Sequence, residues 1–444
     1  MNPIFETKKK VLENRKNSNS LSEVFASIPI PKGNGFWQNL RAFMGPGFMV
    51  AVGYMDPGNW ATDLSGGAQF GYTLLSVILV SSLFAILLQH LALKLGVATG
   101  RDLAQACGDY FSKPVAFFLW ILCELAITAC DLAEVIGSAL ALHLLFDIPI
   151  LMGILITITD VFLILFLQKK GFRVLESIVL ALLIVIVLCF AFELILSKPD
   201  LYPILNGLVP QISIFSDERQ LYVAIGILGA TVMPHNLYLH SSIVQTRAFA
   251  KTDEDRKKAI KFATIDSTIS LGLAFFINAG ILILAASTFY FSGNRGVAEI
   301  QDAHKLLNPV LGSHWASIIF AIALLASGQN ATLTGTLAGQ IVMEGFLDLR
   351  ITPWLRRLIT RAIAILPAFF ITWWWGDNKI GDLLIFSQVI LSMQLSFAVI
   401  PLIWFTSDEK KMGKFVNPTW VKWLAWVTAT IILSLNVYLI AQFL

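Results

Sequence analysis

Two short motifs place polar and sulfur-containing residues beside prolines in the middle of long apolar stretches. The first is MDPGN at residues 55–59, and the second is VMPHN at residues 232–236. Proline removes a backbone donor and clashes with the preceding helical turn, so each motif predicts a broken helix. The carbonyl groups freed at a break need new partners, and a bound cation can serve as one. Ordinary proline kinks in a receptor are the alternative, but they leave the ionisable and sulfur side chains at both breaks unexplained.

The residue types at the two breaks are those of a mixed oxygen and sulfur metal site. Asp56 and Asn59 are three residues apart, as are Ala230 and Met233, so each pair could face one cavity from a single turn. The four would supply a carboxylate, an amide oxygen, a backbone carbonyl and a thioether. Thioether sulfur is a poor ligand for Mg²⁺ and Ca²⁺ and suits softer transition metals. The pattern favours Mn²⁺, Fe²⁺, Co²⁺ or Cd²⁺, with simple core packing as the alternative for Met233.

The composition is that of a membrane protein. Hydrophobic residues make up 56% of the chain and charged residues 14%, against about a quarter charged in soluble domains. A net charge of +3 leaves no basic stripe for nucleic acid. The four cysteines form no CxxC motif, so we expect neither a disulfide framework nor a zinc site. The polar start of the chain shows no removable signal peptide, and its first ~35 residues look disordered or loosely attached.

Hydropathy predicts eleven membrane-spanning helices, since about 20 apolar residues are needed to cross a bilayer. Most of the Lys and Arg residues fall on the side of the N-terminus, which places that end in the cytoplasm and the C-terminus outside. The first, sixth and eighth stretches are interrupted by Gly, Pro or polar residues. The predicted spans are residues 43–70, 72–98, 115–145, 148–168, 174–196, 220–246, 264–291, 312–346, 358–376, 380–405 and 420–443.

The two proline motifs also indicate an internal repeat. They lie five spans apart, and an odd number of spans per repeat forces opposite orientations in the membrane. We therefore expect an all-α protein with an inverted 5+5 repeat, in which the first and sixth helices are broken. A cytoplasmic tail of residues 1–42 would precede the transporter domain of residues 43–444. The first repeat would cover about 43–196, the second about 220–405, and an eleventh helix 420–443 would be appended.

Both motifs, together with GQNATLTGT at residues 328–336, GQ at 339–340 and EGF at 344–346, resemble the Nramp (natural resistance-associated macrophage protein) family. The resemblance runs from about residue 40 to 405. It implies a LeuT-like fold and proton-coupled import of Mn²⁺ or Fe²⁺. By position it implies five metal-binding residues, of which the last would join from the tenth span, although Gln394 lies nearby: Asp56, Asn59, Ala230 (carbonyl), Met233 and Gln388.

Ionisable residues in the third and sixth spans suggest a path for protons. Asp131 and Glu134 are three residues apart in an apolar segment, where two neighbouring acids tend to retain a proton. The imidazole of His235 changes charge near neutral pH. A structural salt bridge for Asp131, helix packing for His235 and membrane anchoring for the arginines are the alternatives. The family resemblance assigns a proton route to Asp56, Asp131, Glu134, His235, Arg247, Arg356 and Arg357.

These observations favour a secondary active metal importer that works by alternating access in a bacterial inner membrane. The chain has no GxxxxGK[ST] motif, so ion gradients must supply the energy, with protons and the metal as cargo and no resident cofactor. An ion-coupled symporter of an amino acid or another small solute is the alternative, although the carboxylate of Asp56 would repel a substrate carboxylate. An enzyme or a non-transporting receptor is not expected, because no loop holds a catalytic constellation.

Overall fold

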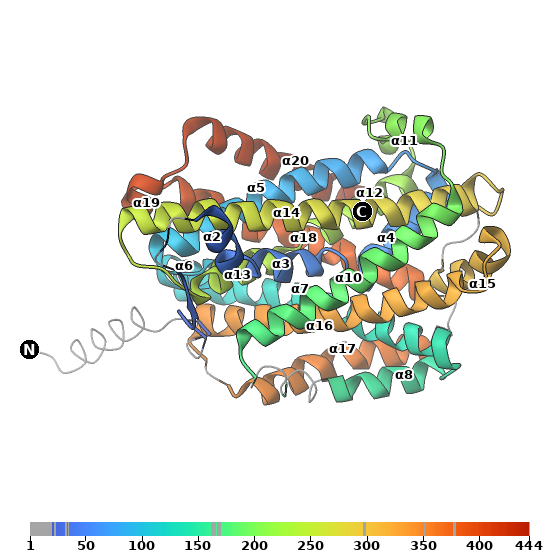
Figure 1. Cartoon of the computed structure of the whole chain (residues 1–444), viewed down its shortest axis with the longest axis horizontal. Coiled ribbons are helices and arrows are strands. Elements are labelled where there is room, and N and C mark those ends of the chain that lie inside the picture. The colour runs from blue at the N-terminus through green and yellow to red at the C-terminus, as the bar shows by residue number, and fades with distance from the viewer. Residues whose placement is uncertain are drawn as a thin grey trace, which may run out of the picture.

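Long helices lying side by side along one axis make up the computed structural model of the chain (Figure 1). It describes residues 20–21, 24–31, 33, 35–160, 166, 170–295, 299–349, 351–375 and 379–443. The helices that run along this axis are α3 (Pro46–Gly53), α4 (Pro57–Phe70), α5 (Leu75–Thr99), α7 (Lys113–Phe146), α8 (Ile150–Ile156), α10 (Phe172–Ser197), α12 (Glu218–Thr231), α13 (Pro234–Ile243), α14 (Asp253–Ala285), α16 (Ala316–Leu347), α17 (Pro353–Trp375), α18 (Ile380–Ser407) and α20 (Thr419–Phe443).

Short elements lie across the two ends of this bundle (Figure 1). The end nearest the N-terminus carries α2 (Phe36–Phe43), α6 (Leu103–Tyr110) and α19 (Glu409–Met412), and the opposite end carries α11 (Leu201–Gly207) and α15 (Ile300–Leu311). The remaining helical elements are short: η1 (Thr157–Thr159), η2 (Ile212–Phe215), η3 (Val244–Thr246), the π-helical η4 (Ala286–Tyr290) and η6 (Gly413–Phe415).

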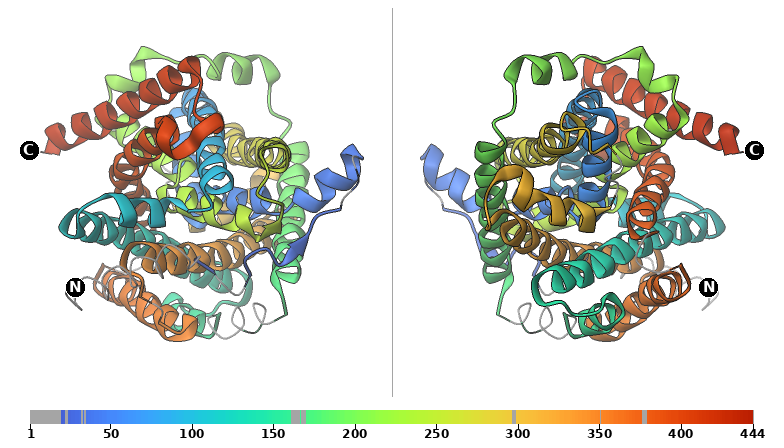
Figure 2. Two further views of the ribbon diagram at one scale, coloured as in Figure 1. Left: turned by 90° about the vertical axis from the view of Figure 1, so that its left-hand side faces the viewer. Right: turned by 90° about the vertical axis from the view of Figure 1, so that its right-hand side faces the viewer.

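Within the described residues, eight helices are long and apolar enough to cross a membrane, and two shorter apolar helices accompany them. The predicted number of eleven spans therefore stays a prediction. The helical positions nevertheless follow the predicted stretches, and the chain is a multi-pass membrane protein. In the end-on views of Figure 2, α20 lies at the outer edge of the bundle, where it packs against α18, while α8 and α17 lie together at the opposite edge.

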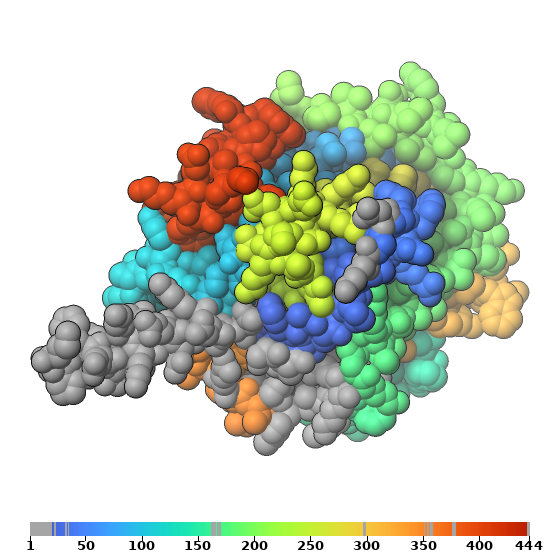
Figure 3. Space-filling view, turned by 60° about the vertical axis from the view of Figure 1, so that its left-hand side comes forward, coloured from blue at the N-terminus to red at the C-terminus, as the bar shows by residue number. Residues whose placement is uncertain are grey.

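The eighth predicted span, whose apolar stretch contains Gly and polar residues, forms the continuous helix α16, which contains no proline. The hydroxyls of Thr332 and Thr336 donate to carbonyls four residues earlier in the same helix, so they find partners without breaking it. The seventh span begins at Asp253 rather than near residue 264. Thr252 caps this polar extension, and its acidic first turn favours the helix N-terminus. The extension meets the segment around Lys414 on the face drawn in Figure 3.

The two broken helices cross the bundle in opposite directions. The first half of one, α3, packs against the second half of the other, α13, and α4 packs against α12. This pairing of first half with second half shows that the two broken helices run antiparallel. The inverted orientation predicted from the odd number of intervening spans is therefore present, and it brings the two proline motifs to the same level.

The expectation of a loosely attached N-terminal segment is wrong for the part that the structure describes. Strand β1 (Ile28–Pro29) pairs in parallel with β2 (Arg247–Ala248), which follows the second broken helix. The backbone N–H of Leu21 also donates to Glu344 Oε2 at 3.2 Å. These long-range backbone contacts have no local sequence signal. Residues 1–19 lie outside the described residues.

Candidate cation site at the helix breaks

The first break is fixed by Asp56 and Pro57. Helix α3 ends at Gly53, and its carbonyl has no donor four residues later because Pro57 lacks an N–H. Asp56 then caps the new helix: its Oδ1 accepts the backbone N–H of Asn59 at 2.8 Å. The carboxylate is fully buried, and its second oxygen, Oδ2, faces the side chains of neighbouring helices.

Amide side chains satisfy most of the backbone that the first break exposes. The Tyr54 carbonyl accepts Nδ2–H groups from both Asn59 and Asn278, each at 2.8 Å. The Met55 carbonyl accepts the hydroxyl of Ser327. The Nδ2 of Asn59 donates to the backbone, whereas its Oδ1 has no hydrogen-bond partner among the described residues. A buried amide oxygen without a partner is costly and is a good ligand for a cation.

The second break repeats this logic with a sulfur side chain. Helix α12 ends at Thr231, and the carbonyl of Ala230 has no helical donor because the residue four positions later is Pro234. Met233 occupies the N-cap position of α13, where its thioether cannot cap the helix. Both Ala230 and Met233 are buried. The proline therefore produces a free carbonyl one turn from the thioether, as the spacing predicts.

The tenth span contributes Gln388 to the same place. Its Nε2 lies 3.5 Å from Asp56 Oδ2 and 3.1 Å from Ser387 Oγ, and its Oε1 has no partner in the described part of the chain. This close approach requires Gly58, because a Cβ at that position would overlap the Gln388 amide. The structure thus places Gln388 beside Asp56, and its part in binding a metal ion stays a prediction.

The five residues form a buried, mixed set of ligand types. Among the described residues, no three His, Cys, Asp or Glu side chains converge closely enough to hold a metal ion by themselves. A cation here would have to use amide, carbonyl and thioether groups around one carboxylate, a set that suits a borderline-soft ion. All are at most 1% exposed: Asp56, Asn59, Ala230, Met233 and Gln388.

A second acidic group lies one helix away, on α7. Asp131 and Glu134 are both buried, and both face Gly335 of α16, where an added Cβ would lie 2.9 Å from Glu134 Oε1. The guanidinium of Arg361 lies beside them. Its Nη1 is 3.4 Å from Glu134 Oε2, and its Nη2 is 3.8 Å from Asp160 Oδ2.

Sequence reasoning missed Arg361. It named Arg356 and Arg357, whose side chains lie outside the described part of the structure. The available signal was an arginine one helical turn after Arg357, further into the apolar helix, where a charge needs a partner. Arg361 is 3% exposed, so its charge is held by Glu134 rather than by water.

His235 and Arg247 lie in different surroundings. His235 is buried, with its Nε2 3.8 Å from the thiol sulfur of Cys130, a residue that also contacts Asp56 and Glu134. Arg247 lies where the second broken helix ends: its Nη1 pairs with Glu176 Oε1 at 2.6 Å. Its guanidinium also donates to carbonyls at the end of α2. Arg247 therefore ties the N-terminal helix to α10 and α13.

Further polar contacts fasten the α3 half of the first broken helix. Gln89 Nε2 donates to the Tyr54 hydroxyl at 2.6 Å, and Gln89 Oε1 lies 2.9 Å from His240 Nδ1 of α13. Asp266 Oδ2 accepts the backbone N–H of Gly47 at 2.7 Å, at the start of α3. The sequence pattern assigned no role to Gln89 or Asp266. Together these contacts hold the α3 half against α5, α13 and α14.

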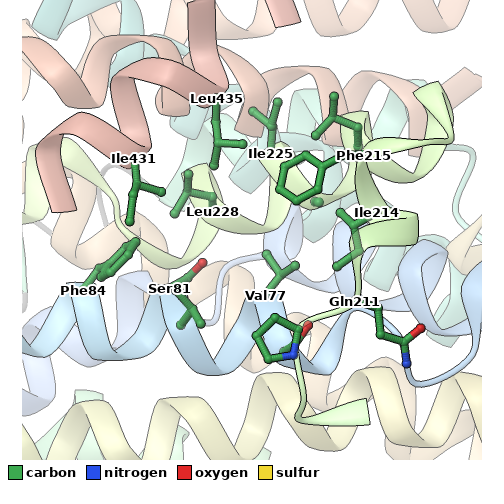
Figure 4. Close-up of a pocket in the computed structure, with 15 residues that line it drawn as sticks. Val77, Ser81, Phe84, Gln211, Ile214, Phe215, Ile225, Leu228, Ile431 and Leu435 are labelled. Carbon is green, nitrogen blue, oxygen red and sulfur yellow. The ribbon is translucent and has the colours of Figure 1, made fainter. Parts of the chain in front are cut away.

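An apolar cavity of about 170 Å³ lies elsewhere, behind α12 (Figure 4). Figure 4 shows side chains from α5, η2, α12 and α20 pointing into it, among them Phe84, Phe215 and Leu435. The described residues that line it include no ionisable side chain. It therefore offers no charged ligand for a cation, and the helix breaks remain the candidate site.

Comparisons with known proteins identify relatives of this chain. The divalent metal cation transporter MntH of Listeria monocytogenes is 63% identical over 425 residues, covering 96% of this chain and 95% of the relative. MntH of Nostoc sp. is 61% identical, covering 96% of this chain and 97% of the relative.

Among solved structures, a manganese transporter of Eremococcus coleocola is similar with a TM-score of 0.88 and 42% identity, covering 96% of this chain and 91% of that one. Mhp1, a nucleobase-cation-symport-1 family transporter, has a TM-score of 0.59 at 15% identity over 90% of this chain and 91% of its own. That likeness shows the fold alone, and it confirms the expected LeuT-like architecture. The model of the natural resistance-associated macrophage protein-like family matches residues 47–442. The chain therefore belongs to the Nramp family.

Proposed function

We propose that the chain is a secondary active importer of divalent transition-metal ions, coupled to protons. The observation that supports this most strongly is the burial of a carboxylate and a thioether where two antiparallel broken helices meet, with two amide oxygens that have no hydrogen-bond partner among the described residues, those of Asn59 and Gln388. Such a place is where secondary transporters hold their substrate, because unwound backbone is tolerated only against protein or a cavity. The cargo would be Mn²⁺, with Fe²⁺, Co²⁺ and Cd²⁺ as further substrates.

Met233 would select transition metals over alkaline-earth ions. Ca²⁺ and Mg²⁺ need six or more oxygen ligands or retained water. The helix breaks provide few oxygens at a buried position and replace one ligand with sulfur. An ion that binds sulfur well recovers more of its hydration free energy at this site than Ca²⁺ or Mg²⁺ does. This difference in binding free energy would be the source of the selectivity.

Protons would be coupled through Asp56 and the α7 acids. Metal binding and protonation compete for the same carboxylate oxygens of Asp56, so a bound ion displaces a proton. From Asp56, Cys130 and His235 lead toward Glu134 and its partner Arg361. This chain of contacts leads away from the helix breaks, and alternating access would expose it to the cytoplasm. The N-terminus is proposed to lie there, with the chain in a bacterial inner membrane.

The deciding experiment is Mn²⁺ uptake into proteoliposomes that carry an internal pH indicator. The wild-type chain should take up Mn²⁺ and acidify the lumen, while Asp56→Ala should abolish both signals. Asp253→Ala removes an exposed carboxylate that pairs with Lys414 outside the site, and it should transport normally. Uptake that survives Asp56→Ala unchanged would refute the assignment.

Selectivity gives a separate test. Met233→Leu keeps most of the side-chain volume and removes only the sulfur. Competition by excess Ca²⁺ and Mg²⁺ should then depress Mn²⁺ uptake more strongly than in the wild type. If the variant rejects both ions as well as the wild type does, the thioether has no part in selection.

A further inference from the structure

We propose that Cys130 is a second sulfur ligand of this site and biases it toward thiophilic divalent ions such as Cd²⁺. The proposal rests on the proposed function, because it concerns the same cation. Cys130 lies on α7, is 2% exposed, and packs in one cluster with Met233 and Leu391. Its Sγ lies 3.9 Å from Asp56 Oδ2. The thiol therefore stands beside both the carboxylate and the thioether of the candidate site.

The 3.9 Å separation is wide for a hydrogen bond and suits two ligands of one ion. Metal–oxygen bonds of about 2.1 Å and metal–sulfur bonds of about 2.3 Å, at a tetrahedral angle, place the two ligand atoms about 3.6 Å apart. A larger ion such as Cd²⁺ lengthens both bonds and brings this value closer to the observed one. An ion could thus bridge Asp56 Oδ2 and Cys130 Sγ with little movement of either helix.

Two amide oxygens near Asp56 that lack a partner among the described residues point to a ligand at this place. Gln388 Nε2 contacts the same Asp56 Oδ2, yet the Oε1 of Gln388 has no partner among the described residues, and neither has Asn59 Oδ1. Both side chains are at least nine-tenths buried. Buried amide oxygens are normally hydrogen-bonded. A cation between Asp56 and Cys130 would give them the partner that the protein does not.

The proton released on binding also has a destination. When the metal–sulfur bond forms, the S–H bond breaks and the proton must be accepted nearby. Glu134 Oε1 lies 3.6 Å from the sulfur, and His235 Nε2 lies 3.8 Å from it. Either group can take the proton, so no outside reactant is needed. The thiol thus links the cation site to the α7 acids.

The test uses the purified full-length chain titrated with Cd²⁺ and with Mn²⁺. Thiolate coordination of Cd²⁺ gives a ligand-to-metal charge-transfer band in the ultraviolet, which carboxylate and thioether ligands alone do not reproduce. The wild type should show this band, and Cys130→Ser should lose it. By calorimetry, Cys130→Ser should bind Cd²⁺ about tenfold more weakly and Mn²⁺ roughly threefold more weakly or less, because sulfur ligands favour softer ions.

Cys189→Ser is the matched control, since Cys189 lies half-buried on α10, and it should keep the band and both affinities. Cys130→Ala repeats the test with a different side chain in case serine disturbs folding. If the wild type binds Cd²⁺ without the band, or if Cys130→Ser keeps the wild-type ratio of affinities, the proposal for Cys130 fails alone. If the wild type binds neither ion, the proposed function fails with it.

Discussion

Replacing Gly58 with alanine would place a methyl group where the Gln388 side chain lies. Gly58 is in the first turn of α4, and a Cβ there would overlap the amide, carbonyl carbon and Cγ of Gln388. The backbone at Gly58 has no positive φ, so the alanine itself is not strained. The cost therefore falls on Gln388, which must swing away from Asp56. The variant tests the packing of the site without removing any proposed ligand.

The magnitude follows from the cost of overpacking. Inserting a methyl group into a well-packed interior costs about 1–3 kcal/mol. If binding bears this cost, because Gln388 can no longer reach the cation, Mn²⁺ affinity should fall about 5- to 150-fold. Gly272→Ala is the control, since a Cβ there meets nothing within 4 Å. That variant should bind normally, and alanine there is worth up to about 1 kcal/mol of helix stability.

A double-mutant cycle separates the clash from other effects. Calorimetry with Mn²⁺ would compare Gly58→Ala in the wild-type background and in a Gln388→Ala background. With the Gln388 side chain truncated, the new methyl group has room, so the second substitution should cost little further affinity. Equal losses in both backgrounds would show that the Gln388 contact is not what Gly58 protects.

Three further predictions concern stability. Arg361→Ala should lower the free energy of unfolding by about 3–5 kcal/mol, because it leaves Glu134 buried without its cation; a denaturant titration in detergent checks this, and adding Glu134→Gln should recover part of the loss. Burial raises the pKa of Glu299, outside the membrane, to about 7. The folded chain then holds a proton that the unfolded chain releases, so stability should fall as pH rises from about 4.5 to about 7. Glu299→Gln should flatten thermal melting points in that window, and parallel profiles would contradict the assignment. Lys414→Ala breaks only an exposed ion pair with Asp253 and should leave the melting point unchanged.

The local features of this protein could be predicted from its residues alone. Proline lacks a donor wherever it occurs, so the two breaks and the free carbonyl of Ala230 follow directly from Pro57 and Pro234. Hydropathy located the helices, and the odd number of spans per repeat predicted that the two broken helices run in opposite directions. The ligand types could likewise be predicted, because the two members of each pair, Asp56 with Asn59 and Ala230 with Met233, lie within a single helical turn.

Which distant groups meet became known from the packing of the helices. This packing brought Gln388 to Asp56, gave Glu134 the partner Arg361, and placed the thiol of Cys130 beside Asp56 and in one cluster with Met233. Each of these contacts joins helices far apart in the chain, and its geometry depends on how whole helices rotate and cross. A sequence pattern reports the spacing along one helix. It carries no comparable signal for which face of that helix a neighbour will cover.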